Sequence, residues 1–392
     1  MNPSGIIYLD YAATTPVDPQ VLDAMLPYFS QVFGNPSSIH SFGQHAEAAL
    51  ERARETTAQA LNCRPDEVIF TSCGSESDNL ALRGAAHAAK KMRHACHILT
   101  SLVEHHAVLH TARQLADLDG FDLEIVPVDE FGMVNPDDVA SRLQPDTAIV
   151  SVMYANNEIG TINPISKIGE ICRQRGVAFH TDAVQAAAYL PVDVNELNVD
   201  LLAIGAHKFY GPKGVGALYI RKGTPLIPSQ TGGGQEFNLR AGTHNIPYIV
   251  GLAKAFRLAQ TERRERIEHL KPMRDYLIGQ VLEGISDARL TGHSSQRLPN
   301  HASFVFDGVD GNALLMMLDV EGFACSSGSA CKTGNPEPSD VLIAMGIPRS
   351  WAFGSLRVTL GVQTTLGEIE AFLKALPSLV EKNRTLGKRV GG

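Results

Sequence analysis

Short β-branched runs alternate with helical patterns along the chain from Glu67 onward. The run EVIFTS (67–72) precedes an Ala-rich segment at 79–91, and HILTS (97–101) precedes a helix-like segment at 106–118. Runs of the same kind recur as DLEIVPV, TAIVSVM, VAFHTD and LLAIGA. Because strands that alternate with helices build βαβ units, the pattern predicts an α/β domain around a mostly parallel sheet. The glycine-containing GPKGVGALYIR predicts a hairpin or an added antiparallel strand.

The regular alternation of strands and helices ends at a long, charged helical pattern at 246–282. The chain then offers ASFVF, the helical NALLMMLDVEG, the strand SLRVTLG and a final helix at 366–382. This order is typical of a smaller α+β domain. We predict a large domain at 15–260 and a small domain formed by 1–14 together with 261–392. A chain of 392 residues is long enough for two cores.

Composition and charge exclude several classes of function. The formal charge is −8, whereas surfaces that bind nucleic acid are net basic, so we expect no direct nucleic-acid ligand. The N-terminus lacks the pattern of a signal peptide and no stretch is apolar enough to cross a bilayer, so we expect a cytoplasmic protein without a membrane association. Six cysteines are too sparse for a disulfide scaffold, which predicts free thiols.

Three motifs place reactive groups at the ends of expected strands. In FTSCGSESDN a strand breaks at Gly74 and Ser75 before a helix, where free NH groups and the helix dipole suit a phosphate. An ordinary Ser N-cap is an equal alternative. Asp182 ends VAFHTD, at the sheet edge where ligands bind, or else it caps the next helix. Lys208 follows LLAIGA, where burial would lower its pKa and favour a Schiff base, although most lysines are solvated.

The combination of these motifs is more informative than any one of them. A phosphate site, a carboxylate that keeps a pyridinium nitrogen protonated and a Schiff-base lysine are the three parts needed to bind pyridoxal 5'-phosphate and use it as an electron sink. The sequence therefore predicts this cofactor at the ends of successive strands.

Twelve short motifs carry a resemblance to a known family. They are YLDYAATTP, FGNPSSIH, SESDN, EHHAVL, NNEIG, HTDAVQ, AHKFYGPKGVGALY, GGGQE, RAGT, SSGSAC, EPS and SLRVTLG. In order and spacing the chain resembles the cysteine desulfurases, the NifS/IscS branch of the class V aminotransferases. The resemblance implies the α/β fold type I of pyridoxal-phosphate transferases, with a mostly parallel seven-stranded sheet between helices and a smaller α+β domain. It also implies removal of sulfur from L-cysteine, giving L-alanine and a persulfide on Cys331.

The same resemblance implies roles for individual residues. Lys208 would form the Schiff base, Asp182 would pair with the ring nitrogen, and His105 would stack on the ring and assist proton transfer. Further cofactor contacts are implied at Gly74, Ser75, Asn157, Gln185, His207 and Thr243, with Thr243 reaching in from a second subunit. Asn35 and Arg357 match the residues that hold the substrate carboxylate, for which a planar guanidinium is well suited.

Cys331, in SSGSAC, matches the nucleophile that takes the sulfur. Its neighbours are small, as expected where a cysteine needs room, and the longer loop resembles the branch whose cysteine hands its persulfide to another protein. The resemblance implies a homodimer and a sulfur-acceptor protein such as an iron–sulfur scaffold. It implies no resident metal, although Cys331 would transiently contact an iron–sulfur cluster on a partner. The sulfur would serve cluster assembly or other thiolation.

Several residues depart from the family pattern or stand outside the predicted site. Gly205 replaces the Ser or Thr that many members place near the phosphate, and His244 follows RAGT, where we expect a surface or interface position. We interpret Cys325 as a core residue rather than a second sulfur relay. The remaining cysteines are interpreted as structural thiols, namely Cys63, Cys73, Cys96 and Cys172.

Two rival interpretations stay open. The first is another fold type I enzyme, such as a selenocysteine lyase, a cystine lyase or an aminotransferase, and an aminotransferase would need no thiol at Cys331. The second is a metal-binding or thiol-binding protein without catalysis, using Cys325, Cys331 and some histidines. Structural zinc sites usually show close CxxC pairs, which this sequence lacks.

Overall fold

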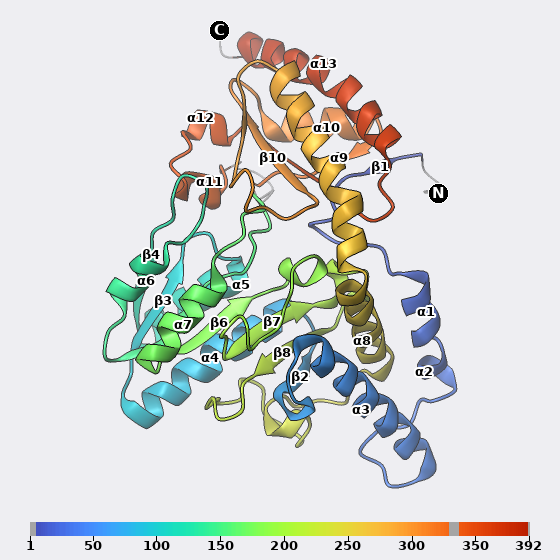
Figure 1. The fold of residues 1–392 in the computed structure, drawn as a ribbon, viewed down its shortest axis with the longest axis vertical. Helices are drawn as coiled ribbons and strands as arrows, with labels where there is room; N and C mark the ends of the chain where they lie inside the picture. The colour runs from blue at the N-terminus through green and yellow to red at the C-terminus, as the bar shows by residue number, and fades with distance from the viewer. Residues whose placement is uncertain (1–4, 329–336, 391–392) are drawn as a thin grey trace.

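The computed structural model describes residues 5–328 and 337–390. A larger α/β part lies below a smaller part in Figure 1. The larger part is built on a seven-stranded sheet of order β2-β8-β7-β6-β5-β3-β4. Its strands are β2 (Val68–Thr71), β3 (His97–Ser101), β4 (Asp122–Val126), β5 (Thr147–Ser151), β6 (Ala178–Asp182), β7 (Leu201–Gly205) and β8 (Gly216–Ile220). Strand β8 runs antiparallel to both of its neighbours, β2 and β7, and the other pairs are parallel. The predicted α/β class and mostly parallel sheet are confirmed.

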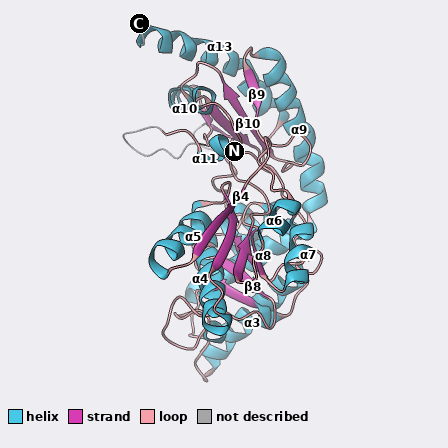
Figure 2. Cartoon of the chain, turned by 90° about the vertical axis from the view of Figure 1, so that its left-hand side faces the viewer, coloured by secondary structure: helices cyan, strands magenta, loops and turns pink. Residues whose placement is uncertain are grey.

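Helices cover both faces of this sheet, as Figure 2 shows. One face carries α4 (Gly74–Arg93) and α5 (His106–Asp119), and the other carries α3 (Ser41–Leu61), α6 (Pro136–Arg142), α7 (Ile165–Arg175) and α8 (Ile246–Thr261). Successive strand residues point to opposite faces. Ile69 and Ile98 pack under α4 and α5, whereas their neighbours Phe70 and Leu99 join the core on the other face. Strands buried on both sides are continuously apolar, which is why the sequence displays them.

The smaller part surrounds a three-stranded antiparallel sheet. Its strands are β12 (Ser355–Thr359), β10 (His301–Phe306) and β9 (Ala288–Leu290), and its main helices are α9 (Arg263–Gly284), α10 (Gly311–Val320) and α13 (Leu366–Val390). The charged pattern at 246–282 forms two helices that meet at Glu262: α8 packs on α3 of the larger part, while α9 packs on β9, β10 and α13. These contacts support a domain boundary near residue 260, which stays a proposal.

The beginning of the chain also contributes to the smaller part. Strand β1 (Ile7–Tyr8) pairs in parallel with β11 (Phe323–Ala324). The short helices α1 (Pro19–Met25) and α2 (Pro27–Ser30) then pack on α8, and α11 (Asp340–Ala344) and α12 (Arg349–Ala352) complete the smaller part. The residues between β1 and α1 therefore cross from one part to the other, and they meet the candidate site on the way.

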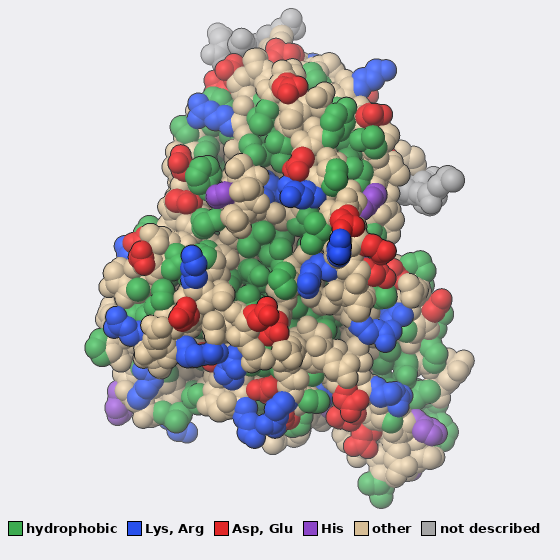
Figure 3. Space-filling model, viewed as in Figure 1, with side chains coloured by type: hydrophobic (Ala, Val, Ile, Leu, Met, Phe, Trp, Pro, Cys, Tyr) green, Lys and Arg blue, Asp and Glu red, His purple; other side chains and the backbone are tan. Residues whose placement is uncertain are grey.

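Charged side chains of both signs are mixed on the surface of the molecule. Figure 3 shows Lys and Arg side chains interspersed with Asp and Glu over one face of the molecule. Within residues 5–328 and 337–390, no helix is both long and apolar enough to span a bilayer.

Candidate active site

Polar side chains from several strand ends converge on one cavity of about 330 Å³. Asp182 is the last residue of β6, Lys208 ends the short 3₁₀ turn that follows β7, and His105 precedes α5. Small-molecule sites usually measure about 300–1,000 Å³, so the cavity suits a ligand of cofactor size. The predicted residues that line it are Gly74, Ser75, His105, Asn157, Asp182, Gln185, His207, Lys208 and Arg357.

Lys208 is held at the floor of the cavity by the chain's N-terminal segment. Its Nζ donates hydrogen bonds of 2.7 Å each to the carbonyl oxygens of Ala12 and Ala13, and Gln185 Nε2 donates to the same Ala12 oxygen at 2.8 Å. Burial lowers the pKa of Lys208 to about 8, and the positive charge of Arg357 acts in the same direction. A lysine with this pKa is partly neutral near physiological pH, so it can attack an aldehyde.

Asp182 is a buried carboxyl group without a cationic hydrogen-bond donor among the residues that the structure describes. Its Oδ1 accepts a hydrogen bond from the Val184 backbone NH at 2.8 Å. Burial raises its pKa, and the charges of His105 and Lys208 oppose that rise only in part. Because a nearby cation favours the charged form of an acid, a protonated ring nitrogen would restore the Asp182 carboxylate.

Asp78, on α4, lines the same cavity, and sequence reasoning gave it no role. The Asp78 and Asp182 oxygens lie within 4.8 Å of each other and of a His105 ring nitrogen. The Asp78 side chain is 1% exposed, and its Oδ1 has no hydrogen-bond partner in the described part of the chain, although His180 Nε2 lies 3.5 Å away. Burial, followed by the charge of Asp182, raises the pKa of Asp78, which favours the neutral form of this carboxyl group.

The N-terminus of α4 forms another wall. The residue that caps this helix is Cys73, whose Sγ accepts from the Glu76 NH at 3.4 Å, so the alternative that Ser75 is the N-cap is wrong. Gly74 and Ser75 stand at the positive end of the helix dipole, as an anion requires. A Cβ on Gly205 would lie 3.4 Å from the Gly74 nitrogen, so the missing Ser or Thr would have stood beside this terminus.

His207 and Arg357 contribute further polar groups. Burial, with the charge of Lys208, lowers the pKa of His207 to about 4, so the ring is neutral. Arg357 donates to Asp10 Oδ1 at 2.8 Å and to the Asn157 carbonyl at 3.0 Å, while its buried Nε has no hydrogen-bond partner among residues 5–328 and 337–390. This guanidinium therefore keeps a donor for an incoming carboxylate.

Two predicted residues do not line the cavity within this chain. Asn35 is exposed, and its Oδ1 accepts from the Ser37 NH. Thr243 is also exposed, as a residue that reaches a second subunit would be in the single chain. The expected surface position of its neighbour His244 is only partly met, because its Nε2 donates to the buried Glu236 at 2.8 Å. The contacts predicted for Asn35 and Thr243 stay predictions.

The cysteines divide into different environments. Cys331 lies outside the described residues. Cys325 packs against the hydrophobic core, and burial raises the pKa of its thiol, which disfavours the reactive thiolate. Cys172 is buried, and burial raises its pKa to about 12. Cys73 caps α4 at the cavity wall, where sequence reasoning had not placed it.

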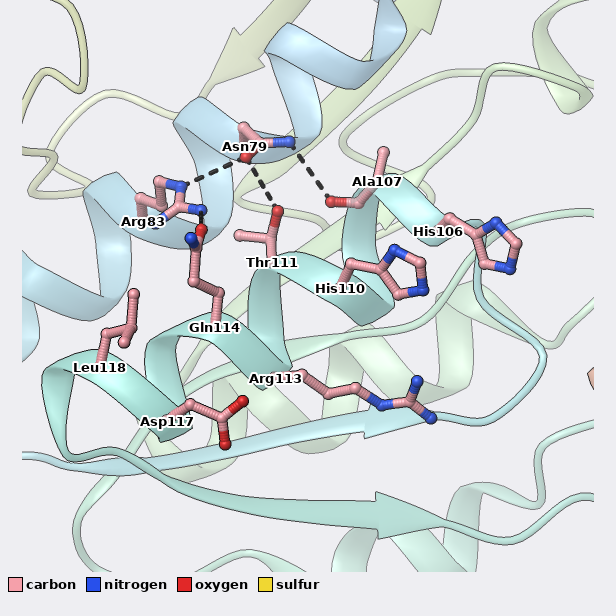
Figure 4. Close-up of a pocket in the computed structure, with 10 residues that line it drawn as sticks. All are labelled: Asn79, Arg83, His106, Ala107, His110, Thr111, Arg113, Gln114, Asp117 and Leu118. Carbon is pink, nitrogen blue, oxygen red and sulfur yellow. Dashed lines mark hydrogen bonds between the residues drawn. The ribbon is translucent and has the colours of Figure 1, made fainter.

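A larger hollow of about 650 Å³ lies on the outer surface between α4 and α5 (Figure 4). Several of its polar groups bond one another: Asn79 Oδ1 accepts from Thr111 Oγ1 and Arg83 Nε, and Asn79 Nδ2 donates to the Ala107 carbonyl. Reactive groups with perturbed pKa values are found in the smaller cavity instead, so the chemistry belongs there.

Comparison with known proteins agrees with this geometry. The sequence profile of the family described as Aminotransferase class-V matches residues 7–372. The chain belongs to this family. It is 50% identical over 380 residues to the cysteine desulfurase IscS of Dictyoglomus turgidum, covering 97% of this chain and 96% of that protein. It is 47% identical to the cysteine desulfurase IscS of Methanosarcina thermophila, with 97% and 93% covered.

Solved structures give the same family assignment. A NifS-like protein superposes with a TM-score of 0.89 at 37% identity, over 96% of this chain and all of that one. The apo structure of a cysteine desulfurase from Thermococcus onnurineus gives 0.85 at 27% identity, with 97% and 96% covered. The class V family uses pyridoxal 5'-phosphate. The lysine, the buried carboxylate and the helix N-terminus around the cavity have the chemistry to hold that group.

Proposed function

We propose that this protein removes sulfur from L-cysteine with pyridoxal 5'-phosphate bound to Lys208, giving L-alanine and a persulfide on Cys331. One observation carries the proposal: Lys208, Asp182 and the N-terminus of α4 meet at a single cavity that Arg357 also lines. Relatives named as cysteine desulfurases, at 46–50% identity over nearly the full length, support the choice of substrate.

Each residue then has a physical task. Gly74 and Ser75 bind the phosphate, and Asp182 pairs with the protonated ring nitrogen. Arg357 holds the substrate carboxylate through its free donor. When bound, the cofactor supplies an electron sink that stabilises negative charge at the substrate Cα. Lys208, whose pKa is about 8, is suited to take the Cα proton and later return one.

Sulfur transfer is assigned to the thiol of Cys331. Its thiolate attacks the substrate sulfur, the new S–S bond forms as the substrate C–S bond breaks, and the bonding electrons stay with the carbon fragment, which is protonated and leaves as alanine. His105 lies at the cavity edge, where it can protonate or deprotonate a thiol. The balance of atoms requires no added oxidant.

We further propose a homodimer in which Thr243 of each chain completes the phosphate site of the other, and a sulfur-acceptor protein such as an iron–sulfur scaffold. The exposed position of Thr243 supports the first point. A reducing, cytoplasmic setting fits a reaction that consumes a free thiol.

Mass spectrometry after brief exposure to L-cysteine tests the function. One added sulfur atom is expected on the peptide that contains Cys331, together with an equal amount of alanine. Cys331→Ser should abolish the adduct, and the matched variant Cys325→Ser should keep it. An adduct on the Cys325 peptide, or alanine formation by Cys331→Ser at the normal rate, would refute the assignment.

A further inference from the structure

Glu158, in the NNEIG motif, is not among the residues that line the cofactor cavity, and its carboxyl group lies beside residues that flank the segment carrying Cys331. The structure does not describe residues 329–336, but it describes the residues on either side of them. We call residues 326–328 the first stem and residues 337–339 the second stem. Both stems meet the carboxyl group of Glu158, as the following contacts show.

The second stem is attached to Glu158 by a hydrogen bond. Ser339 Oγ donates to Glu158 Oε2 at 2.5 Å. The same hydroxyl accepts from the Leu342 NH at 3.3 Å and so forms the N-cap of α11. Ser339 is 4% exposed, which shields this bond from water. The carboxyl group thus fixes the point where the second stem becomes a helix.

The first stem packs directly against the same oxygen atom. A Cβ placed on Gly328 would lie only 2.7 Å from Glu158 Oε2. Real Cβ atoms do not approach so closely, so the backbone of Gly328 contacts a carboxyl that Ser339 holds in place. One oxygen of Glu158 therefore lies between the two stems.

The first stem is also joined to Arg357, which lines the cavity. Ser326 and Arg357 exchange backbone hydrogen bonds, with the Arg357 NH donating at 2.7 Å and the Ser326 NH at 3.3 Å. The Arg357 guanidinium donates to the carbonyl of Asn157, the residue before Glu158. The Glu158 NH in turn donates to Asn156 Oδ1 at 2.7 Å. These contacts form a closed path: Glu158 touches the first stem at Gly328, the first stem bonds Arg357 through Ser326, and Arg357 bonds Asn157, which precedes Glu158.

We propose that Glu158 is a positioning residue that sets both stems of the Cys331 segment relative to Arg357. The proposal rests on the proposed function, in which Arg357 holds the substrate and Cys331 receives its sulfur. Misplacement of a reacting group by about 1 Å can cost about 100-fold in rate. Loss of this anchor should therefore slow sulfur transfer without weakening the binding of L-cysteine.

The test uses the full-length protein with its cofactor. The rate of persulfide formation on Cys331 in a single turnover, by mass spectrometry, and the KM for L-cysteine are measured for Glu158→Ala, Ser339→Ala and the double variant. We expect each single variant to slow persulfide formation by about 10- to 100-fold with an unchanged KM. Because both substitutions break one contact, the double variant should be no slower than the slower single variant.

Two further variants separate positioning from a general loss of structure. Glu158→Gln keeps an oxygen that accepts from Ser339, and it should recover a rate within about threefold of the wild type. Asp310→Ala removes the N-cap of α10 elsewhere in the smaller part, where the Ala313 NH donates to Asp310 Oδ1, and it should not slow persulfide formation. Ser339→Ala leaves Glu158 intact and serves as the test if Glu158→Ala does not fold.

The outcomes distinguish this inference from the function beneath it. Normal persulfide rates in Glu158→Ala and Ser339→Ala, with a wild type that forms the persulfide, would overturn the anchor and leave the proposed function standing. A raised KM with an unchanged maximal rate would also overturn it, because Glu158 would then act on substrate binding. A wild type that forms no persulfide on Cys331 would overturn both.

Discussion

The amine of Lys208 should capture the cofactor with a pH dependence set by its buried position. Burial lowers the pKa of Lys208 to about 8. An ordinary lysine titrates near 10.4. Only the neutral amine attacks an aldehyde. At pH 8 about half of the Lys208 amines are neutral, against roughly one in 250 for a solvated lysine, which is an advantage of about 100-fold. Capture should therefore accelerate as the pH rises toward 8 and then level off.

Stopped-flow absorbance of cofactor-free protein mixed with pyridoxal 5'-phosphate measures this rate. Lys208→Ala provides the baseline without a Schiff base. Asp10→Asn provides a test of sign: the charge of Asp10 raises the pKa of Lys208, so its removal should move the midpoint below that of the wild type. A rate that keeps rising toward pH 10, or a midpoint that Asp10→Asn moves upward, would refute the electrostatic account.

Three further predictions concern other parts of the molecule. Arg54→Ala leaves Glu236, which is 5% exposed, without the guanidinium that donates to both of its oxygens. The free energy of unfolding, measured by urea titration, should fall by about 3–5 kcal/mol, and an unchanged midpoint would contradict this prediction. Gly361→Ala puts a Cβ into the ring of Tyr11 and should cost about 1–3 kcal/mol, so an unshifted melting curve would show that the ring moves freely. Asp182→Asn should reduce kcat about 10²- to 10³-fold while the protein stays yellow, and full activity in steady-state assays would remove Asp182 from the mechanism.

The central sheet could be predicted closely because its signal is local. The run HILTS is β3 at its predicted residues, and LLAIGA contains β7, since strands covered on both faces are continuously apolar. The reactive groups at strand ends followed from the same reasoning. Parallel strands share one edge, so Asp182 and Lys208 had to approach each other once their strands were adjacent.

Other features depend on contacts between distant residues. The pairing of β1 with β11 joins residues at opposite ends of the chain, and two-residue strands leave little local pattern. The carbonyls of Ala12 and Ala13 that receive Lys208 are backbone groups, which no side-chain motif reveals. The sequence analysis gave Asp78 no role, because its burial appears only once α4 is packed on the sheet.

The central claim is that Lys208 is the covalent attachment point of the cofactor, and reduction with borohydride tests it most directly. The purified yellow protein is reduced, digested and analysed by mass spectrometry. The account predicts a phosphopyridoxyl group on Lys208 and its disappearance in Lys208→Ala. A reduced cofactor on a different lysine, or a wild-type protein that binds none at saturating concentration, would contradict it.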